Sequence, residues 1–201
     1  MAMKSTDSTI ELFRTHGGLL RTGEALELGV HPRDLYRLRD EGLIEALSRG
    51  IYRLTELPPL SDPDLVTVAL RVPRAVVCLI SALAFHELTE QVPHEVQIAL
   101  PRDTKTPVLD YPPIRVFRFS EATLSSGVEE FTLDGVSLRV FGPAKSVADC
   151  FRFRNKLGVD VAVDALSRWL ARADSKPADL LRFARVCGVK RVITPYLEAL
   201  Q

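Results

Sequence analysis

Two arginines, Arg33 and Arg37, stand one helical turn apart in a short segment that also carries Leu35, Tyr36 and Leu38. At about 100° per residue, an α-helix through this segment places the two leucines on one side and Arg33, Tyr36 and Arg37 on the other. Guanidinium groups donate paired hydrogen bonds to guanine edges and to phosphate oxygens. We therefore expect a helix that turns its leucines toward a core and presents its arginines to the major groove of DNA.

The segments around this helix provide the elements that a recognition helix needs. Ser8 and Thr22 are suited to cap two helices, and Pro32 is suited to begin the third after a glycine-bearing turn. A turn at 48–50 separates two β-prone runs that predict a hairpin, 43–47 and 51–54. Helix, helix, turn, helix and hairpin in this order predict a winged helix-turn-helix over residues about 8 to 55.

Further groups of this domain are expected to contact DNA outside the recognition helix. Arg49 at the tip of the wing and Arg53 on its return strand are expected to reach phosphates or the minor groove. Arg21 and the backbone N–H groups at Thr22 and Gly23, at the start of a helix, are expected to hold another phosphate. The predicted DNA-binding residues are therefore Arg21, Thr22, Arg33, Tyr36, Arg37, Arg49 and Arg53.

The alternative for these arginines is ion pairing on an exposed helix face, with Asp34, Asp40, Glu41 and Glu45 as partners. The net charge is zero, from 26 basic and 26 acidic side chains, and it does not mark a nucleic-acid binder. The positive excess lies in the C-terminal third, outside the predicted winged helix. We therefore expect one copy to bind DNA weakly, and useful affinity to need two copies on a repeated operator or help from C-terminal helices.

A proline-rich stretch at 57–63 predicts a domain boundary, because prolines interrupt both helices and sheets. We expect a DNA-binding domain at 1–58 and a second domain at 59–201. The second domain begins with a helix capped by Ser61 or Asp62, and a later helix, 82–88, is capped by Ser81. Runs rich in β-formers follow at 95–100, 114–119, 131–133 and 136–141, and helical periods at 143–155, 161–173, 177–186 and 195–200. The predicted fold class is α+β: an N-terminal winged helix-turn-helix followed by a mixed domain with a small β-sheet and C-terminal helices.

Basic residues recur near helical spacing in the last third of the chain. The set comprises Arg168, Arg172, Arg182, Arg185, Lys190 and Arg191. Such a face is suited to bind nucleic acid. The alternative is a solvated face on which these residues pair with Asp160, Asp164, Asp174 and Asp179.

The sequence carries no signature of a common cofactor or of a metal site. P-loop, G-x-G-x-x-G, G-x-S-x-G and H-E-x-x-H patterns are absent. The three cysteines Cys78, Cys150 and Cys187 are far apart and form no C-x-x-C pair, so we expect neither a disulfide nor a zinc site. No apolar run reaches the length of a membrane span, and the N-terminus has no export signal. We expect a cytoplasmic protein without cofactor, metal or catalytic residues.

One enzymatic alternative is a metal-dependent nuclease. Asp64 and the Asp103-Thr104-Lys105 segment have the residue types of such a site, in which carboxylates bind the ion and a lysine assists the attacking water. The long gap between them, and the place of Asp103 in a loop between two prolines, argue against it.

Three segments resemble the AbiEi family of antitoxins from type IV toxin–antitoxin systems. They are Gly29–Leu38 with the wing Ser48–Leu54, the segment Ser81–Leu88, and Asp134–Arg152 followed by Leu157-Gly158. The resemblance implies a winged helix that binds inverted repeats at its own promoter and represses transcription. It also implies that the C-terminal domain is of the antitoxin type and neutralises a co-encoded nucleotidyltransferase-like toxin without forming a stable complex with it. We expect the basic face of the last third to carry this activity.

The resulting hypothesis is a transcriptional autorepressor and antitoxin that is not an enzyme. The alternative from a different class is a stand-alone winged-helix transcriptional regulator without a toxin, whose second domain serves dimerisation or ligand sensing.

Overall fold

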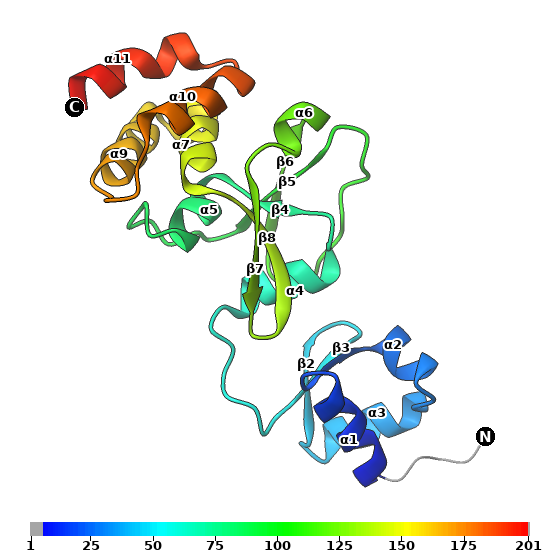
Figure 1. The fold of residues 1–201 in the computed structure, drawn as a ribbon. Coiled ribbons are helices and arrows are strands. Elements are labelled where there is room, and N and C mark those ends of the chain that lie inside the picture. The colour runs from blue at the N-terminus through cyan, green and yellow to red at the C-terminus, as the bar shows by residue number, and fades with distance from the viewer. Residues whose placement is uncertain (1–5, 201) are drawn as a thin grey trace. The chain divides into compact units, whose positions relative to one another are not determined.

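The computed structural model describes residues 6–200, which fold into two compact units, 6–67 and 68–200 (Figure 1). The first unit contains α1 (Thr6–Thr15), β1 (Leu19–Arg21), α2 (Thr22–Glu27), α3 (Pro32–Asp40), β2 (Ile44–Ser48) and β3 (Ile51–Leu54). The predicted winged helix-turn-helix is confirmed, with three helices followed by the β2–β3 hairpin.

The sheet of the first unit has a third strand that the sequence did not predict. β1 pairs antiparallel with β3, so the order in the sheet is β1-β3-β2. β1 has only three residues, too few to show a period of two. Its pairing with β3 comes from tertiary contacts that a local pattern does not contain. The helices and the sheet enclose a core of buried side chains from all of these elements, among them Phe13, Leu20, Ala25, Leu35, Leu38, Ile44 and Leu54.

Helix α4 (Pro63–Arg71) contains the point where the two compact units divide. Asp62 caps it as expected, because its Oδ1 accepts a hydrogen bond of 2.9 Å from the Leu65 backbone N–H. The two units divide at Thr67, later in the chain than the boundary predicted at residue 58. The division into domains at 1–58 and 59–201 stays a prediction.

The second unit is built on a five-stranded mixed sheet with the order β6-β5-β4-β8-β7. Its strands are β4 (Val76–Val77), β5 (Val96–Pro101), β6 (Ile114–Phe119), β7 (Val128–Leu133) and β8 (Val136–Phe141). β5 runs parallel to β6 and β4 parallel to β8, whereas β7 and β8 form an antiparallel hairpin. The hairpin turns at Asp134-Gly135 with φ of 49° and 81°, the left-handed pair that the sequence predicted.

The helices of the second unit are α5 (Leu79–Phe85), α6 (Glu121–Leu124), α7 (Pro143–Arg152), α8 (Arg154–Leu157), α9 (Val159–Leu170), α10 (Pro177–Val186) and α11 (Lys190–Leu200). Helix α7 contacts α5, α9 and α10, and these helices lie to the left of the strands of this sheet in Figure 1. The α+β fold class is therefore confirmed, and α10 has the predicted bounds.

Several predicted helix boundaries are wrong. α1 begins at Thr6, so that Ser8 lies inside it, and the N-cap residue of α2 is Arg21 and not Thr22. α7 ends at Arg152 and α9 spans Val159–Leu170, whereas helices at 143–155 and 161–173 were expected.

The helix predicted to begin after Ser81 starts at Leu79, and Ser81 is buried inside it, where its Oγ accepts a 2.9 Å hydrogen bond from the Gln97 backbone N–H on β5. Helix α11 begins at Lys190 and continues through Pro195, although only a last turn from Pro195 was expected. Pro195 is exposed, so the helix tolerates the ring at the loss of one backbone hydrogen bond.

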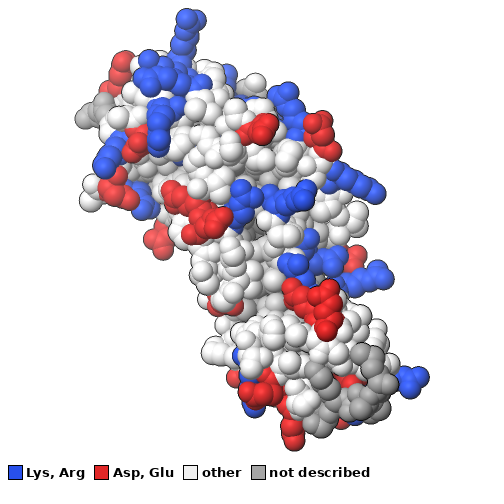
Figure 2. All heavy atoms as spheres, turned by 45° about the vertical axis from the view of Figure 1, so that its right-hand side comes forward, with Lys and Arg blue, Asp and Glu red and all other residues white. Residues whose placement is uncertain are grey.

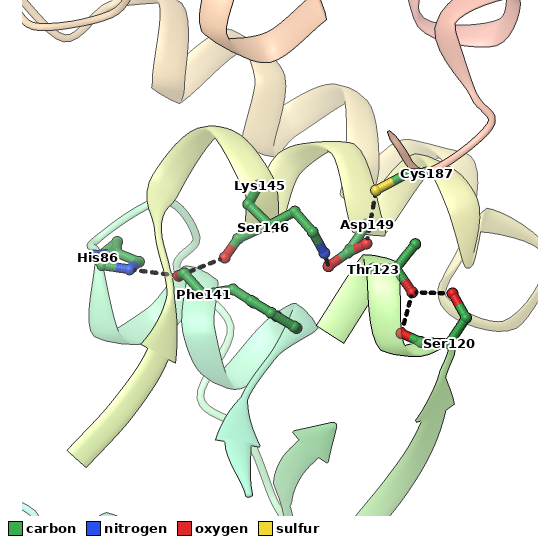
Figure 3. A network of polar contacts seen from close by, with 8 residues as sticks. All are labelled: His86, Ser120, Thr123, Phe141, Lys145, Ser146, Asp149 and Cys187. Atoms are coloured by element: carbon green, nitrogen blue, oxygen red, sulfur yellow. Dashed lines mark hydrogen bonds and ion pairs between the residues drawn. The ribbon is translucent and has the colours of Figure 1, made fainter. Parts of the chain in front are cut away.

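A fully buried ion pair lies on α7, between Lys145 and Asp149 (Figure 3). The Lys145 ammonium also lies 3.9 Å from the centre of the Phe141 ring at the end of β8. The Cys187 thiol, which follows α10, donates a 3.1 Å hydrogen bond to Asp149 Oδ1. Burial raises the pKa of the Asp149 carboxyl, and the charge of Lys145 opposes this rise.

The backbone carbonyl of Phe141 is a second junction of the same network. It accepts hydrogen bonds from Ser146 Oγ at 2.9 Å and from His86 Nε2 at 2.8 Å. Because the carbonyl can only accept, Nε2 of His86 carries the proton. Burial lowers the pKa of His86, so the ring stays neutral. These contacts fix the end of β8 and the start of α7 to α5.

The buried pair of Lys145 and Asp149 leads to a prediction about stability. Lys145→Met leaves the Asp149 carboxylate buried without its counter-charge, and we expect a loss of about 3–5 kcal/mol in the free energy of unfolding. The double variant Lys145→Met/Asp149→Leu removes both charges and should recover most of that loss. Urea denaturation of the two variants and the parent chain measures both quantities. A single variant that loses less than about 1 kcal/mol would contradict the proposed dependence on the pair.

Candidate nucleic-acid interface

Helix α3 is held in place by its N-cap and by two buried leucines. His31 is the N-cap residue, and its Nδ1 accepts a 3.2 Å hydrogen bond from the Arg33 backbone N–H. Pro32 occupies the first helical turn, where its missing N–H removes no helical hydrogen bond. Leu35 and Leu38 are buried in the core of the first unit, as the sequence predicted. The opposite side of α3 is therefore turned outward.

Arg33 and Tyr36 occupy this outward side. Arg33 is exposed, and within residues 6–200 its guanidinium has no ion-pair partner. Tyr36 is 51% exposed. Arg39 lies beside them, with its guanidinium 5.4 Å from the centre of the Tyr36 ring, and donates from Nη2 to Asp40 Oδ1 at 2.8 Å. This contact raises the pKa of Arg39 and occupies much of its hydrogen-bonding capacity.

The prediction that Arg37 projects freely beside Arg33 is wrong. Arg37 Nη2 lies 3.1 Å from Oδ1 of Asp34, whose side chain is buried, and Nε lies 3.9 Å from Glu41 Oε1. Nε and Nη2 are both shielded from solvent and have no hydrogen-bond partner with good geometry among the described residues. The edge of the guanidinium that would contact guanine with two hydrogen bonds therefore faces the protein.

Asp34 is a positioning residue for α3 that the sequence interpretation did not single out. It was considered only as one of several possible ion-pair partners. Its spacing of three residues from Arg37 was a visible signal, because residues three apart are neighbours on a helix. What the spacing did not show is that the Asp34 side chain is buried, so that the pair holds Arg37 against the helix.

The wing contributes one of its two predicted arginines to the surface. Arg49 is exposed in the turn between β2 and β3. Arg53 is buried: its Nη1 donates a 3.1 Å hydrogen bond to Glu45 Oε1, and its Nη2 donates to the Pro58 carbonyl. The prediction that Arg53 reaches phosphates is therefore wrong, because its guanidinium is held by the protein itself.

The predicted phosphate site at the start of α2 is partly occupied by the protein. The Thr22 backbone N–H donates to the Gly50 carbonyl at 2.9 Å, and the Arg21 backbone N–H donates to Glu24 Oε2 at 2.9 Å. The side chains of Arg21 and Thr22 are half-buried. The N–H group of Thr22 is thus not available to an anion, and the role of the Arg21 side chain stays a prediction.

The basic face predicted in the last third divides into paired and unpaired residues. Arg168 is paired with Asp164 and Glu90, both at 2.9 Å, and Arg172 with Asp174 at 3.0 Å. Arg182 lies 3.4 Å from Asp179. These three arginines are therefore ion-paired, as expected for the alternative of a solvated helix face. The remaining residues of the set are exposed, namely Arg185, Lys190 and Arg191.

The residues considered for a nuclease belong to separate elements of the structure. Asp64 is in α4, whereas Asp103 and Lys105 are in the connection between β5 and β6. Within residues 6–200, no three side chains of the His, Cys, Asp and Glu types are grouped so that they could hold a metal ion. The nuclease alternative gains no support from this geometry.

A comparison with protein families identifies the segment that carries these residues. A family model described as "Transcriptional regulator, AbiEi antitoxin" matches residues 7–55. This segment is thus similar to the AbiEi family. The match covers nearly all of α1 to β3, so the winged helix of this chain is the part that is similar to this family of transcriptional regulators. The resemblance that the sequence suggested is confirmed for this part of the chain.

The fold of both units also has a counterpart among solved structures. The crystal structure of the RV2827C protein from Mycobacterium tuberculosis matches with a TM-score of 0.56 at 15% sequence identity, over 100% of this chain and 83% of that chain. At this identity the likeness concerns the fold alone. No curated protein matches the chain. In the described part, no helix is long and apolar enough to cross a membrane.

The buried Asp34, which faces Arg37 in the winged helix, leads to a second prediction about stability. Asp34→Asn removes the charge that faces Arg37, and we expect the free energy of unfolding to fall by about 1–3 kcal/mol. Asp40→Asn is the matched control, since Asp40 is exposed and pairs with Arg39 at the surface, and it should change stability by less than about 0.5 kcal/mol. Urea denaturation measures both. Equal effects of the two substitutions would show that the Asp34–Arg37 pair does not hold α3.

Proposed function

We propose that the chain is a transcriptional autorepressor whose winged helix binds inverted repeats in its own promoter. The observation that carries this proposal is the orientation of α3, with Leu35 and Leu38 in the core and Arg33 and Tyr36 outside, in the segment that matches the family. The N-terminal residues of a recognition helix are the ones that contact base edges in helix-turn-helix proteins. Arg33 is the second residue of α3 and occupies that position.

The arginines of the domain divide into two groups with different roles. Arg33, on α3, and Arg49, at the wing, are exposed and are assigned to base and phosphate contacts. Arg37 and Arg53 stabilise the domain through acidic partners, and Arg37 retains a partly exposed guanidinium that suits a single phosphate contact. Few contacts per domain favour two copies on a repeated operator over one copy alone.

We also assign to the chain an antitoxin function that neutralises a co-encoded nucleotidyltransferase-like toxin, without a stable complex and without enzymatic activity. The description of the matched family supports the antitoxin part of this proposal. We assign the activity to the second unit, because the recognition surface belongs to the first. The protein would act in the cytoplasm, where its promoter is.

The first test concerns DNA binding. Arg33→Ala should weaken binding to DNA from the region upstream of the gene by about 1–3 kcal/mol, which is roughly tenfold to a hundredfold. Arg168→Ala is the matched control, because Arg168 is paired with two carboxylates in the second unit, and it should leave binding unchanged. Fluorescence anisotropy with an upstream duplex and a scrambled duplex measures both variants. Unchanged affinity of a folded Arg33→Ala variant would refute the role of α3.

The second test separates repression from toxin neutralisation. The chain is co-expressed with the reading frame downstream of its gene, and growth is measured together with a reporter on its own promoter. Arg33→Ala should lose repression and keep its rescue of growth, because the two activities are assigned to different units. Lys145→Met should lose rescue, since it destabilises the second unit. Loss of rescue in a folded Arg33→Ala variant, or no rescue by the parent chain, would contradict the antitoxin assignment.

A further inference from the structure

Three cations form a row along one edge of the sheet in the second unit. We call them the edge row: Arg115 on β6, Arg152 at the end of α7 and Lys156 on α8. β6 is an outer strand, because it pairs with β5 on one side only. The spacing of basic residues in the sequence predicts a basic surface elsewhere in this unit, on the last helices.

The edge row rests on a cluster of three phenylalanines. The Arg115 guanidinium is 5.3 Å from the centre of the Phe117 ring, and the Lys156 ammonium is 6.0 Å from the same centre. Phe153 lies between the elements, with its ring centre 5.2 Å from that of Phe117.

The same phenylalanine cluster holds Arg152. Its guanidinium lies 5.5 Å from the Phe119 ring centre and 5.6 Å from that of Phe153, and the Lys156 ammonium lies 5.9 Å from Phe153. Aromatic faces attract cations, and the long side chains cover apolar surface while their charges stay in water. The three cations are thus ordered before any partner arrives, which lowers the entropic cost of binding.

The edge row is only partly neutralised by acidic side chains. Arg115 lies 3.4 Å from Glu95, and both side chains are more than a third exposed. Arg152 and Lys156 have no carboxylate within 4 Å in the described part of the chain. The carboxylate that acts electrostatically on Arg152 is Asp149, which is buried and paired with Lys145. Arg168 and Arg172 differ from Arg152 and Lys156 because each forms an ion pair with a carboxylate.

Figure 2 shows basic side chains on one face of the second unit. It turns the right-hand side of Figure 1 forward, which is the side of β6 and α6 in that unit. Lys and Arg side chains form several groups in the upper part of the picture, with fewer acidic side chains between them. A surface of this kind attracts a polyanion at a distance of about 10 Å or less at moderate salt.

We infer that the edge row is a second DNA-binding surface, which contacts phosphates along one strand of a duplex. Ordered, incompletely neutralised cations are suited to a phosphate backbone. Single-stranded nucleic acid is less favoured, because it needs exposed rings on which bases stack, and Phe117 and Phe119 are almost fully buried. This inference rests on the proposed DNA-binding function, and it assigns to the second unit the sequence-independent part of the affinity.

The test compares two variants of the full-length protein that each lose two positive charges. Arg115→Gln/Lys156→Gln removes two members of the edge row and leaves the half-buried Arg152 in place. Lys190→Gln/Arg191→Gln is the matched control on α11, where the spacing of basic residues predicts the surface. Affinity for an upstream duplex and a scrambled duplex is measured by fluorescence anisotropy at several salt concentrations, with circular dichroism as a check of folding.

The edge-row variant should weaken binding to both duplexes by the same factor. It should also reduce the slope of log affinity against log salt by about one for the unpaired Lys156, and by less than one more for Arg115, which Glu95 partly neutralises. The control should keep the parent slope. An unchanged slope in the edge-row variant, or an equal reduction in the control, would overturn the inference. Weakened binding only to a single-stranded RNA probe of the same length would also overturn it.

The outcome is separable from that of the proposed function. Arg33→Ala should reduce the preference for the upstream duplex over the scrambled one and leave most of the salt slope, because it removes a base contact. If Arg33→Ala has no effect while the edge-row variant loses slope, the edge row binds DNA and the assignment of α3 fails. If the reverse holds, α3 reads DNA and the edge row does not contribute.

Discussion

The second unit depends on one interaction, the buried ion pair of Lys145 and Asp149. Two charges in a core are costly unless each compensates the other, because the interior solvates ions far less well than water does. The pair meets this condition only if α7 lies with one face against Phe141 and another against Cys187. The same burial raises the pKa of the Cys187 thiol to about 12, so that it stays protonated and donates to Asp149. The pair therefore couples α7 to β8 on one side and to the segment after α10 on the other.

A related arrangement operates at a smaller scale in the first unit. The buried carboxylate of Asp34 faces Arg37, and the Glu45 carboxylate and the Pro58 carbonyl hold Arg53. These arginines belong to the framework of the domain, although their residue type and spacing suit DNA contact equally well. Arg33 differs because the residues three and four positions further along the helix, Tyr36 and Arg37, are not acidic, and it stays exposed at the beginning of α3. Ion pairing within the protein therefore decides which arginines can contact DNA, as much as the number of arginines does.

Local patterns predicted the parts of the fold whose causes are local. The order of elements in the winged helix, the left-handed turn at Asp134-Gly135 and the bounds of α10 each follow from turn residues, prolines or helical periodicity. The errors arose at positions whose structure depends on contacts with residues far away in the sequence. β1 forms because β3 lies beside it, and Ser81 is buried because β5 supplies the Gln97 N–H. Arg53 is lost from the candidate site for the same reason: Glu45 and Pro58 surround it only in the folded chain.

A net charge of zero is compatible with DNA binding if pairing, rather than composition, sets the effective charge of each surface. An unpaired protein cation that binds a phosphate releases a counter-ion condensed on the DNA, and this release contributes free energy to binding. A cation that is already paired with a protein carboxylate must first give up that pair, so it contributes little. By this criterion Arg168 and Arg172 contribute little, whereas Arg33 and the unpaired members of the edge row, Arg152 and Lys156, contribute most. A domain with one unpaired arginine on its recognition helix can make a sequence-specific contact, but it makes too few contacts to bind DNA tightly. A second, sequence-independent surface on the same chain would raise affinity without altering that choice, and so would a second copy on a repeated site.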